Sequence, residues 1–163
     1  MKILYHGGEN IIKQPEIREP ERTLDFGKGF YLTTSKRQAT DWVHRRLERT
    51  QANVGFLNEY EFKSTDAEKD LKIKIFDSPN EDWLDFVMSN RRIVGFEHNY
   101  DIVVGPVAND RVYTAFALFE GGTISKEILI RELKTYRLVD QYLFHTPESL
   151  KYLVFNDAKE IRK

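Results

Sequence analysis

The sequence contains no cysteine among its 163 residues. This absence excludes a disulfide, a zinc site built on thiolates and a cysteine nucleophile. The chain also lacks an apolar run that approaches the roughly 20 residues needed to span a bilayer. Its first residues, 1–5, show no charged leader before an apolar stretch, so we expect no signal peptide and a cytoplasmic protein.

A surplus of positive charge is missing as well. Lys and Arg total 25 against 26 for Asp and Glu, which leaves a net charge of -1. A general polyanion-binding protein usually carries a basic excess, so this balance argues against one. The pairs Arg45-Arg46 and Arg91-Arg92 are short, and such pairs usually lie on solvated helix faces. The alternative is that they contact a nucleotide phosphate or an acidic acceptor.

Clusters of metal-ligating residues are also missing. His44, His98 and His145 do not combine with acidic residues at the spacing of metal ligands, so we predict no metal site. Residues 9–25 are polar, include Pro15 and form a long predicted loop. A loop of this length in a compact domain is often a lid or a binding segment.

The composition is that of one ordinary domain covering residues 1–163. Hydrophobic residues make up 40% and aromatic residues 13%, enough for a sizeable core. Helical and strand patterns are interspersed without a regular β–α repeat, which predicts an α+β fold. Strands are expected at 2–7, 29–34, 54–63, 71–76, 102–106 and 137–145. Helices are expected after the N-caps Ser35, Ser78, Asn109 or Asp110, Ser125 and Thr146, the last helix with Leu150, Leu153 and Val154 buried.

Several of the nine glycines lie beside His6 and Tyr31. An isolated histidine among apolar neighbours is usually a hydrogen-bonded structural residue, but Gly7-Gly8 would end its strand and open space beside the imidazole. The simplest interpretation of Tyr31 by itself is an aromatic residue of the hydrophobic core. Gly29, Tyr31 and Thr33 alternate along one strand face, which would suit a flat ligand ring stacked on the tyrosine. The pattern therefore indicates a small-molecule cleft.

A polar pair interrupts the apolar strand at 137–145. Gln141 alternates with Val139 and Leu143, whereas Asp140 alternates with Tyr142 on the other face. One of the two must point among apolar neighbours, where an unpartnered polar group costs about 1 to 3 kcal/mol. Such a residue is either bonded within the core or faces a site.

These motifs resemble the ADP-ribosyltransferase superfamily, in its His-Tyr-Glu or diphtheria-toxin-like branch. The resemblance lies in Tyr5-His6-Gly7 on a first strand, residues 29–35 leading into a helix, and a polar residue on a late strand. More narrowly, residues 25–34 resemble small bacterial proteins that are often encoded beside a short helical partner in a toxin–antitoxin arrangement. Residues 105–110 and 140–146 are similar to the same group, so the resemblance touches most of the chain.

The resemblance implies two facing, strongly bent sheets with flanking helices and NAD in the cleft between them. It implies that His6 bonds a ribose hydroxyl of the adenosine half, that Gly7 lies near the nicotinamide amide and that Tyr31 stacks on the nicotinamide ring. Thr33 and Ser35 would support the pocket or the start of the helix. The residues expected to contact NAD are His6, Gly7, Gly29, Tyr31, Thr33 and Asn109.

Gln141 stands where the family has a glutamate near the nicotinamide ribose. Glutamine keeps the hydrogen bonds and loses the negative charge. Preorganised charge at such a centre can be worth about 3 kcal/mol or more. Either the protein is slow or inactive, or another carboxylate helps. Asp110 is the preferred helper, although it also fits a plain helix cap, and Asp140 is second because it points to the opposite face.

Three functions remain open. The leading one is an NAD-dependent ADP-ribosyltransferase, the toxin of a toxin–antitoxin pair, with catalytic residues His6, Tyr31, Gln141 and Asp110. Its acceptor would be a protein, a nucleic acid or, in an NAD glycohydrolase, water. The second is a weak or inactive module that binds NAD, another nucleotide or a partner protein. The third is a nuclease that uses His6 and His145 as acid and base, which the near-neutral charge disfavours.

Overall fold

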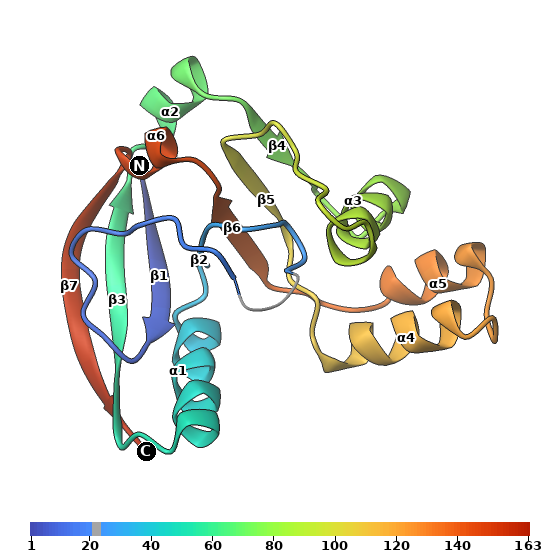
Figure 1. The fold of residues 1–163 in the computed structure, drawn as a ribbon, viewed down its shortest axis with the longest axis horizontal. Coiled ribbons are helices and arrows are strands. Elements are labelled where there is room, and N and C mark those ends of the chain that lie inside the picture. The colour runs from blue at the N-terminus through green and yellow to red at the C-terminus, as the bar shows by residue number, and fades with distance from the viewer. Residues whose placement is uncertain (21–23) are drawn as a thin grey trace.

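The structure is a computed structural model that describes residues 1–20 and 24–163. In these ranges the chain forms an α+β fold with two sheets and six helices, the class that the sequence predicts (Figure 1). The strands are β1 (Lys2–Gly8), β2 (Phe30–Leu32), β3 (Val54–Phe62), β4 (Ile73–Ile75), β5 (Ile102–Pro106), β6 (Asp140–Phe144) and β7 (Leu153–Arg162). The helices are α1 (Lys36–Thr50), α2 (Ser64–Asp70), α3 (Glu81–Arg92), α4 (Asp110–Glu120), α5 (Lys126–Leu133) and α6 (Pro147–Leu150).

The two sheets differ in size and in strand direction. The three-stranded sheet has the order β1-β3-β7 and is antiparallel throughout. The four-stranded sheet has the order β2-β6-β5-β4 and is mixed, because β4 runs parallel to β5. A bridge between Tyr5 and Thr33 links β1 to the residue after β2. In Figure 1 the three-stranded sheet lies at the left and the four-stranded sheet in the middle, with α3, α4 and α5 beyond it.

Apolar side chains cover both faces of the four-stranded sheet. One cluster, which we call the inter-sheet core, joins it to the three-stranded sheet and includes Leu4, Leu32, Tyr60, Phe62, Ile102 and Phe144. The other, which we call the helical core, joins its opposite face to α3, α4 and α5 and includes Phe26, Trp83, Val103, Phe116, Leu129 and Leu143. Successive side chains of a strand point to opposite faces of the sheet, so neighbouring residues pack into different cores.

Helix α1 lies so close to the three-stranded sheet that glycine is required there. A Cβ on Gly7 would overlap the carbonyl oxygen of Ala39, and a Cβ on Gly55 would lie 2.6 Å from Cγ1 of Val43. The packing of α1 therefore accounts for Gly7. Gly8 differs, because its Cβ would meet only the edge of His6, at 3.5 Å from Nε2.

Most predicted helix starts are confirmed by their caps. The side chains of Ser35, Ser125 and Thr146 each accept a hydrogen bond from a backbone N–H three residues on. One predicted cap, Ser78, is wrong, and the structure chooses between the two residues predicted for another cap, Asn109 and Asp110. Helix α3 is capped by Asn80, which accepts from Trp83 N at 3.0 Å, and not by Ser78. Asn109 caps α4, and Asp110 is the first residue of that helix.

The end of the chain differs from the sequence prediction. Helix α6 ends at Leu150, so the expected helical burial of Leu153 and Val154 is wrong. Both residues open β7, where they pair with β3, and Val154 is 44% exposed. The backbone of β3 offers a long edge whose hydrogen-bonding groups need partners, and β7 supplies them. The sequence patterns also do not predict helix α2, because its seven residues show no apolar periodicity.

Replacing Gly7 by alanine should test the close approach of α1. The new methyl group would collide with the backbone of Ala39, so we expect the free energy of unfolding to fall by about 1 to 3 kcal/mol. Gly8→Ala is the matched control, because its methyl group would make only ordinary contacts. Urea denaturation of both variants measures the difference. Equal losses of stability in the two variants would contradict the close approach of α1 at Gly7.

Candidate functional site

Two predicted site residues project from neighbouring strands onto the same face of the four-stranded sheet. Tyr31 on β2 lies opposite Leu143 on β6, and paired residues of antiparallel strands share a face. Gln141 is two residues before Leu143 and therefore lies on that face as well. Leu143 belongs to the helical core and Tyr31 packs against it. The sheet thus brings Tyr31 and Gln141 to one side.

The hydroxyl group of Tyr31 is held by the chain that precedes β2. It donates to the carbonyl oxygen of Gly27 at 2.5 Å and accepts from the N–H of Phe26 at 3.2 Å. Burial, and to a lesser extent the nearby charge of Asp25, raises the pKa of Tyr31. The phenol therefore stays protonated and cannot act as a base. Its two hydrogen bonds fix the orientation of the half-buried ring.

The imidazole of His6 reaches the backbone of Tyr31 and not its ring. Nδ1 lies 2.7 Å from the carbonyl oxygen of Tyr31, and the ring stacks on Phe30 with centroids 4.2 Å apart. A carbonyl only accepts, so Nδ1 carries the proton of this bond. Burial lowers the pKa of His6, which favours the neutral ring. Nε2 is then an acceptor, and it lies beside Gly8.

Gln141 is almost completely buried, with 5% of the residue exposed. Within the described part of the chain, its Nε2 is buried and has no hydrogen-bond partner. Gln141 lies opposite Gly105, and a Cβ on that glycine would lie 3.1 Å from the ring of Phe26. An unpartnered buried amide costs about 1 to 3 kcal/mol, so this position needs an explanation.

The other predicted residues have structural tasks that account for them. Thr33 is fully buried and donates to Asp140 Oδ1 at 3.0 Å, while its oxygen accepts from Ser35 N. Asp140 also accepts from both the N–H and the hydroxyl of Thr34. The carboxylate is thereby committed to the end of β2, on the face away from Gln141.

Among the described residues, neither Asn109 nor Asp110 is joined to this group by a hydrogen bond or an ion pair. Asn109 Oδ1 accepts from Val112 N at 3.1 Å, which is a cap bond, and Asp110 is exposed. The role of Asp110 as a catalytic helper remains a prediction. Gly29 has φ 152°, and a Cβ there would overlap the side chain of Leu143 and the carbonyl oxygen of Phe144. Gly29 is thus required where the chain enters β2.

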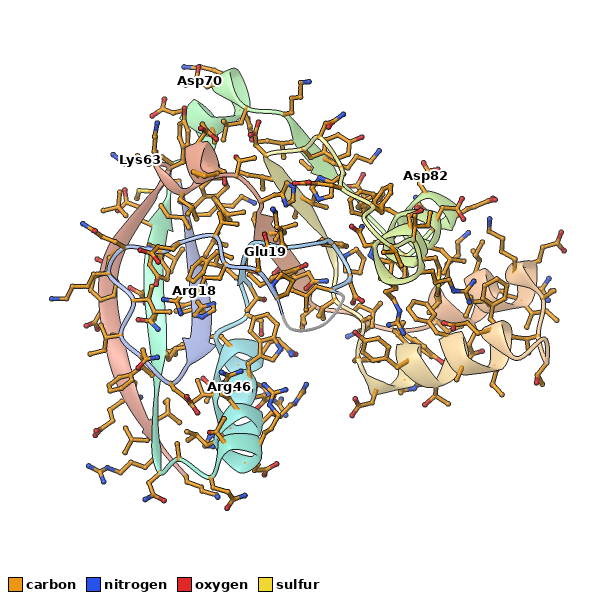
Figure 2. All side chains as sticks on the ribbon, viewed as in Figure 1. Arg18, Glu19, Arg46, Lys63, Asp70 and Asp82 are labelled. Atoms are coloured by element: carbon orange, nitrogen blue, oxygen red, sulfur yellow. The ribbon has the colours of Figure 1, made fainter. Side chains whose placement is uncertain are left out.

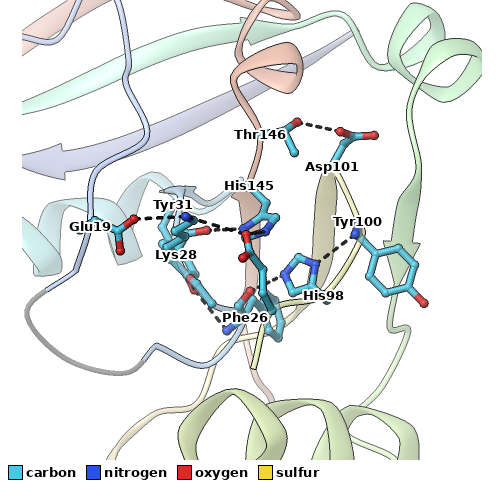
Figure 3. A network of polar contacts seen from close by, with 11 residues as sticks. Glu19, Phe26, Lys28, Tyr31, His98, Tyr100, Asp101, His145 and Thr146 are labelled. Atoms are coloured by element: carbon cyan, nitrogen blue, oxygen red, sulfur yellow. Dashed lines mark hydrogen bonds and ion pairs between the residues drawn. The ribbon is translucent and has the colours of Figure 1, made fainter. Parts of the chain in front are cut away.

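Two further histidines meet beside the segment of residues 26–28, which we call the pinned segment (Figure 3). His98 Nε2 lies 2.8 Å from the carbonyl oxygen of Phe26, and His98 Nδ1 accepts from the N–H of Tyr100 at 3.1 Å. His145 Nδ1 lies 2.6 Å from the carbonyl oxygen of Lys28. The centroids of the two imidazoles are 4.1 Å apart. Sequence reasoning did not pair them, because 46 residues lie between them in the chain and no local pattern reports the contact.

The histidine pair forms part of the wall of a hollow of about 470 Å³. Its lining includes Glu19, Lys28, Asn90, Phe96, Glu97, His98 and His145. His145 Nε2 faces Glu97 Oε1 at 3.4 Å. In the nuclease reading His145 would cooperate with His6, but the described contacts join His6 to Phe30 and Tyr31, and His145 to His98 and Lys28. The hydrogen bonds therefore give that reading no support.

A buried carboxylate that sequence reasoning missed is that of Asp25. Tyr113 on α4 donates to its Oδ2 at 3.2 Å, and Arg91 Nη1 on α3 lies 3.7 Å from its Oδ1. The guanidinium of Arg91 also stacks on the ring of Tyr113, with Cζ 4.9 Å from the centroid. The sequence carries a usable signal, since Asp25 is the first residue of the motif at residues 25–34.

The basic pairs and the long loop are tied to nearby groups. Arg92 pairs with Glu120 at 3.2 Å, and Arg46 projects from α1 with its Nε 4.0 Å from Glu9 Oε1 (Figure 2). In the loop, the N–H of Ile12 donates to Asn58 Oδ1 at 2.9 Å. The predicted lid, 9–25, includes residues 21–23, which lie outside the described residues, so its closure stays a prediction.

Comparison with known proteins identifies the family. The model of the family described as "Protein of unknown function (DUF3990)" matches residues 2–155, and the chain belongs to this family. The matched range contains His6, Tyr31, Asp25 and Gln141. No curated protein matches the chain. Across the described ranges, no helix is long and apolar enough to cross a membrane, and no group of three or more potential ligands could hold a metal ion.

Acidification should weaken the fold through His98. Burial lowers the pKa of His98 below its ordinary value of 6.5, and the neighbouring His145 lowers it further, while the hydrogen bond to the Phe26 carbonyl offsets part of this. The unfolded chain then binds more protons than the folded one, so the free energy of unfolding falls as the pH drops below about 6.5. The free energy of unfolding stops falling once the pH lies below the pKa that His98 has in the folded protein. Urea denaturation at a series of pH values measures this slope.

The matched variants for that measurement are His98→Gln and His44→Gln. A glutamine at 98 can still donate to Phe26 but does not titrate, so the slope below about pH 6.5 should decrease. His44 is exposed on α1, and its replacement should leave the slope unchanged. The same slope in all three proteins would exclude His98 as its source.

Proposed function

We propose that this protein is an NAD-dependent ADP-ribosyltransferase that breaks the bond between nicotinamide and ribose. The observation that carries the proposal is the free edge of β1 at Gly7. Tyr5 exchanges both of its backbone hydrogen bonds with Thr33, at 2.8 and 3.0 Å. Gly7 is two residues further along the strand, so its N–H and C=O point to the same edge. In the described ranges no backbone partner from β2 reaches them.

A strand edge of this kind is complementary to a carboxamide. The nicotinamide amide carries one donor group and one acceptor group, and Gly7 offers one acceptor and one donor. His6 precedes Gly7, and its Nε2 would accept a hydrogen bond from a ribose hydroxyl. Tyr31 lies on strand β2 and offers a ring of fixed orientation on which the nicotinamide would stack. The resemblance in Tyr5-His6-Gly7 and residues 29–35 points to the same chemistry.

Gln141 would bind the nicotinamide ribose. Its buried Nε2, which has no partner in the described residues, could donate to the oxygen of the 2'-hydroxyl group. As the bond to nicotinamide breaks, positive charge develops on the ribose, and a neutral carboxamide stabilises that charge less than a carboxylate. We therefore expect slow turnover. The acceptor of ADP-ribose would be a protein, a nucleic acid or water.

The second candidate is a module that binds NAD without turning it over. The observation that favours it is the same neutral Gln141, together with the exposed position of Asp110. Titration calorimetry with NAD separates the two candidates, because binding without release of nicotinamide supports the module. In either case we propose that the protein acts in the cytoplasm as the toxin of a pair with a short helical antitoxin. Growth arrest on expression, relieved by the neighbouring reading frame, would support that pairing.

Purified protein should release nicotinamide from NAD above a buffer control. We expect Tyr31→Ala to lower the rate by about 100-fold or more, because the stacking surface is lost, whereas Tyr31→Phe keeps the ring and should retain most of the rate. His6→Ala should also lower it. Chromatography of nicotinamide, with thermal melting of each variant as the folding control, makes the measurement. No release by the natural sequence, with or without cell extract as acceptor, would refute catalysis.

Replacing Gln141 by glutamate should raise turnover. The new carboxylate would supply negative charge at the ribose, and we expect an increase of about 10-fold or more in nicotinamide release. Gln51→Glu adds the same charge at an exposed position beyond α1 and should change nothing. An unchanged or lower rate for the Gln141 variant would show that missing charge is not what limits the reaction.

A further inference from the structure

Asp25 is the only acidic residue that is buried in the described ranges, with 9% exposed. The other carboxylates considered so far are exposed or serve the backbone, as Asp110 and Asp140 do. A carboxylate is costly to bury, and this one is retained beside a half-buried arginine and a tyrosine hydroxyl. A buried charge at a candidate site often has a function.

Asp25 is next in the chain to the segment that holds the hydroxyl group of Tyr31. Asp25 directly precedes Phe26, whose N–H donates to the Tyr31 hydroxyl, and that hydroxyl donates in turn to Gly27. Residues 25–27 therefore wrap around the end of the tyrosine ring. The negative charge of Asp25 is among the causes that raise the pKa of Tyr31, after burial, so its field reaches this ring.

A charge at this position distinguishes the two redox forms of the dinucleotide. The nicotinamide ring of oxidised NAD is a pyridinium with a full positive charge, and the ring of NADH is neutral. We propose that Asp25 makes the site selective for oxidised NAD over NADH, by holding a buried negative charge beside the ring on which nicotinamide stacks. This inference rests on the proposed function, since it takes Tyr31 as the stacking surface.

Two electrostatic effects both attract the positively charged pyridinium ring. The face of a tyrosine ring attracts a cation, and the carboxylate attracts it further through a medium that screens less than water. Arg91 offsets part of the second effect, because it lies 3.7 Å from the same carboxylate. The remaining preference should still amount to about tenfold in the dissociation constant.

Titration calorimetry of the full chain with NAD and with NADH tests the inference without requiring turnover. We expect the natural sequence to bind NAD about tenfold or more tightly than NADH. Asp25→Asn keeps an acceptor for Tyr113 and removes the charge, so the ratio should fall to about threefold or less, mainly through weaker binding of NAD. Asp82→Asn, an exposed charge removal on α3, is the matched control and should leave the ratio unchanged.

A second variant keeps the test decisive if Asp25→Asn does not fold. Arg91→Gln removes the cation beside Asp25, so the preference for NAD should increase, by about threefold. Thermal melting shows which variants are folded. Equal ratios in the natural sequence and in the folded variants would overturn the role of Asp25 and leave the proposed function standing. Failure of the natural sequence to bind either dinucleotide would overturn the proposed function and this inference together.

Discussion

Three consecutive backbone carbonyl groups, those of the pinned segment, hold together parts of the chain that are far apart in sequence. The carbonyl of Phe26 binds His98, that of Gly27 binds the hydroxyl of Tyr31, and that of Lys28 binds His145. The side chains come from the segment after α3, from β2 and from the end of β6. Gly27 and Gly29 have φ of 87° and 152°, which other residues rarely adopt. The glycine-rich motif is thus needed to present these carbonyls in order.

The same bonds determine the protonation of the imidazoles. Because a carbonyl only accepts, each histidine bound to one must carry its proton on that nitrogen, so His6 and His145 are protonated on Nδ1 and His98 on Nε2. For His98 the other nitrogen is occupied as well, by the N–H of Tyr100. The Nε2 of His145 faces Glu97 Oε1, and the Nε2 of His6 lies beside Gly8. The neutral state of His6 follows from burial and makes Nε2 an acceptor, as a ribose hydroxyl would require.

Much of the local structure could be predicted from the sequence, because its causes are local. Ser35, Ser125 and Thr146 cap helices through bonds that reach only three residues along the chain. Strand parity likewise predicted that Asp140 and Gln141 lie on opposite faces. The structure in turn corrects the last helix, since Leu153 and Val154 belong to β7, which is stabilised by β3 almost a hundred residues earlier. No local pattern reports such a partner.

Some features of the candidate site could likewise be predicted from the sequence, and others required the structure. The sequence by itself determined that glycines surround His6 and Tyr31, that one polar residue of β6 must be buried and that no thiol chemistry is available, because composition and strand parity are properties of the chain alone. Only the tertiary structure decided that Tyr31 and Gln141 share a face, that His6 binds the backbone of Tyr31 and that Gly7 is required by α1. It also decided that the carboxylate of Asp25 is buried, because that depends on α3 and α4 supplying Arg91 and Tyr113. Pairing across a sheet and burial against a helix arise only when distant segments meet.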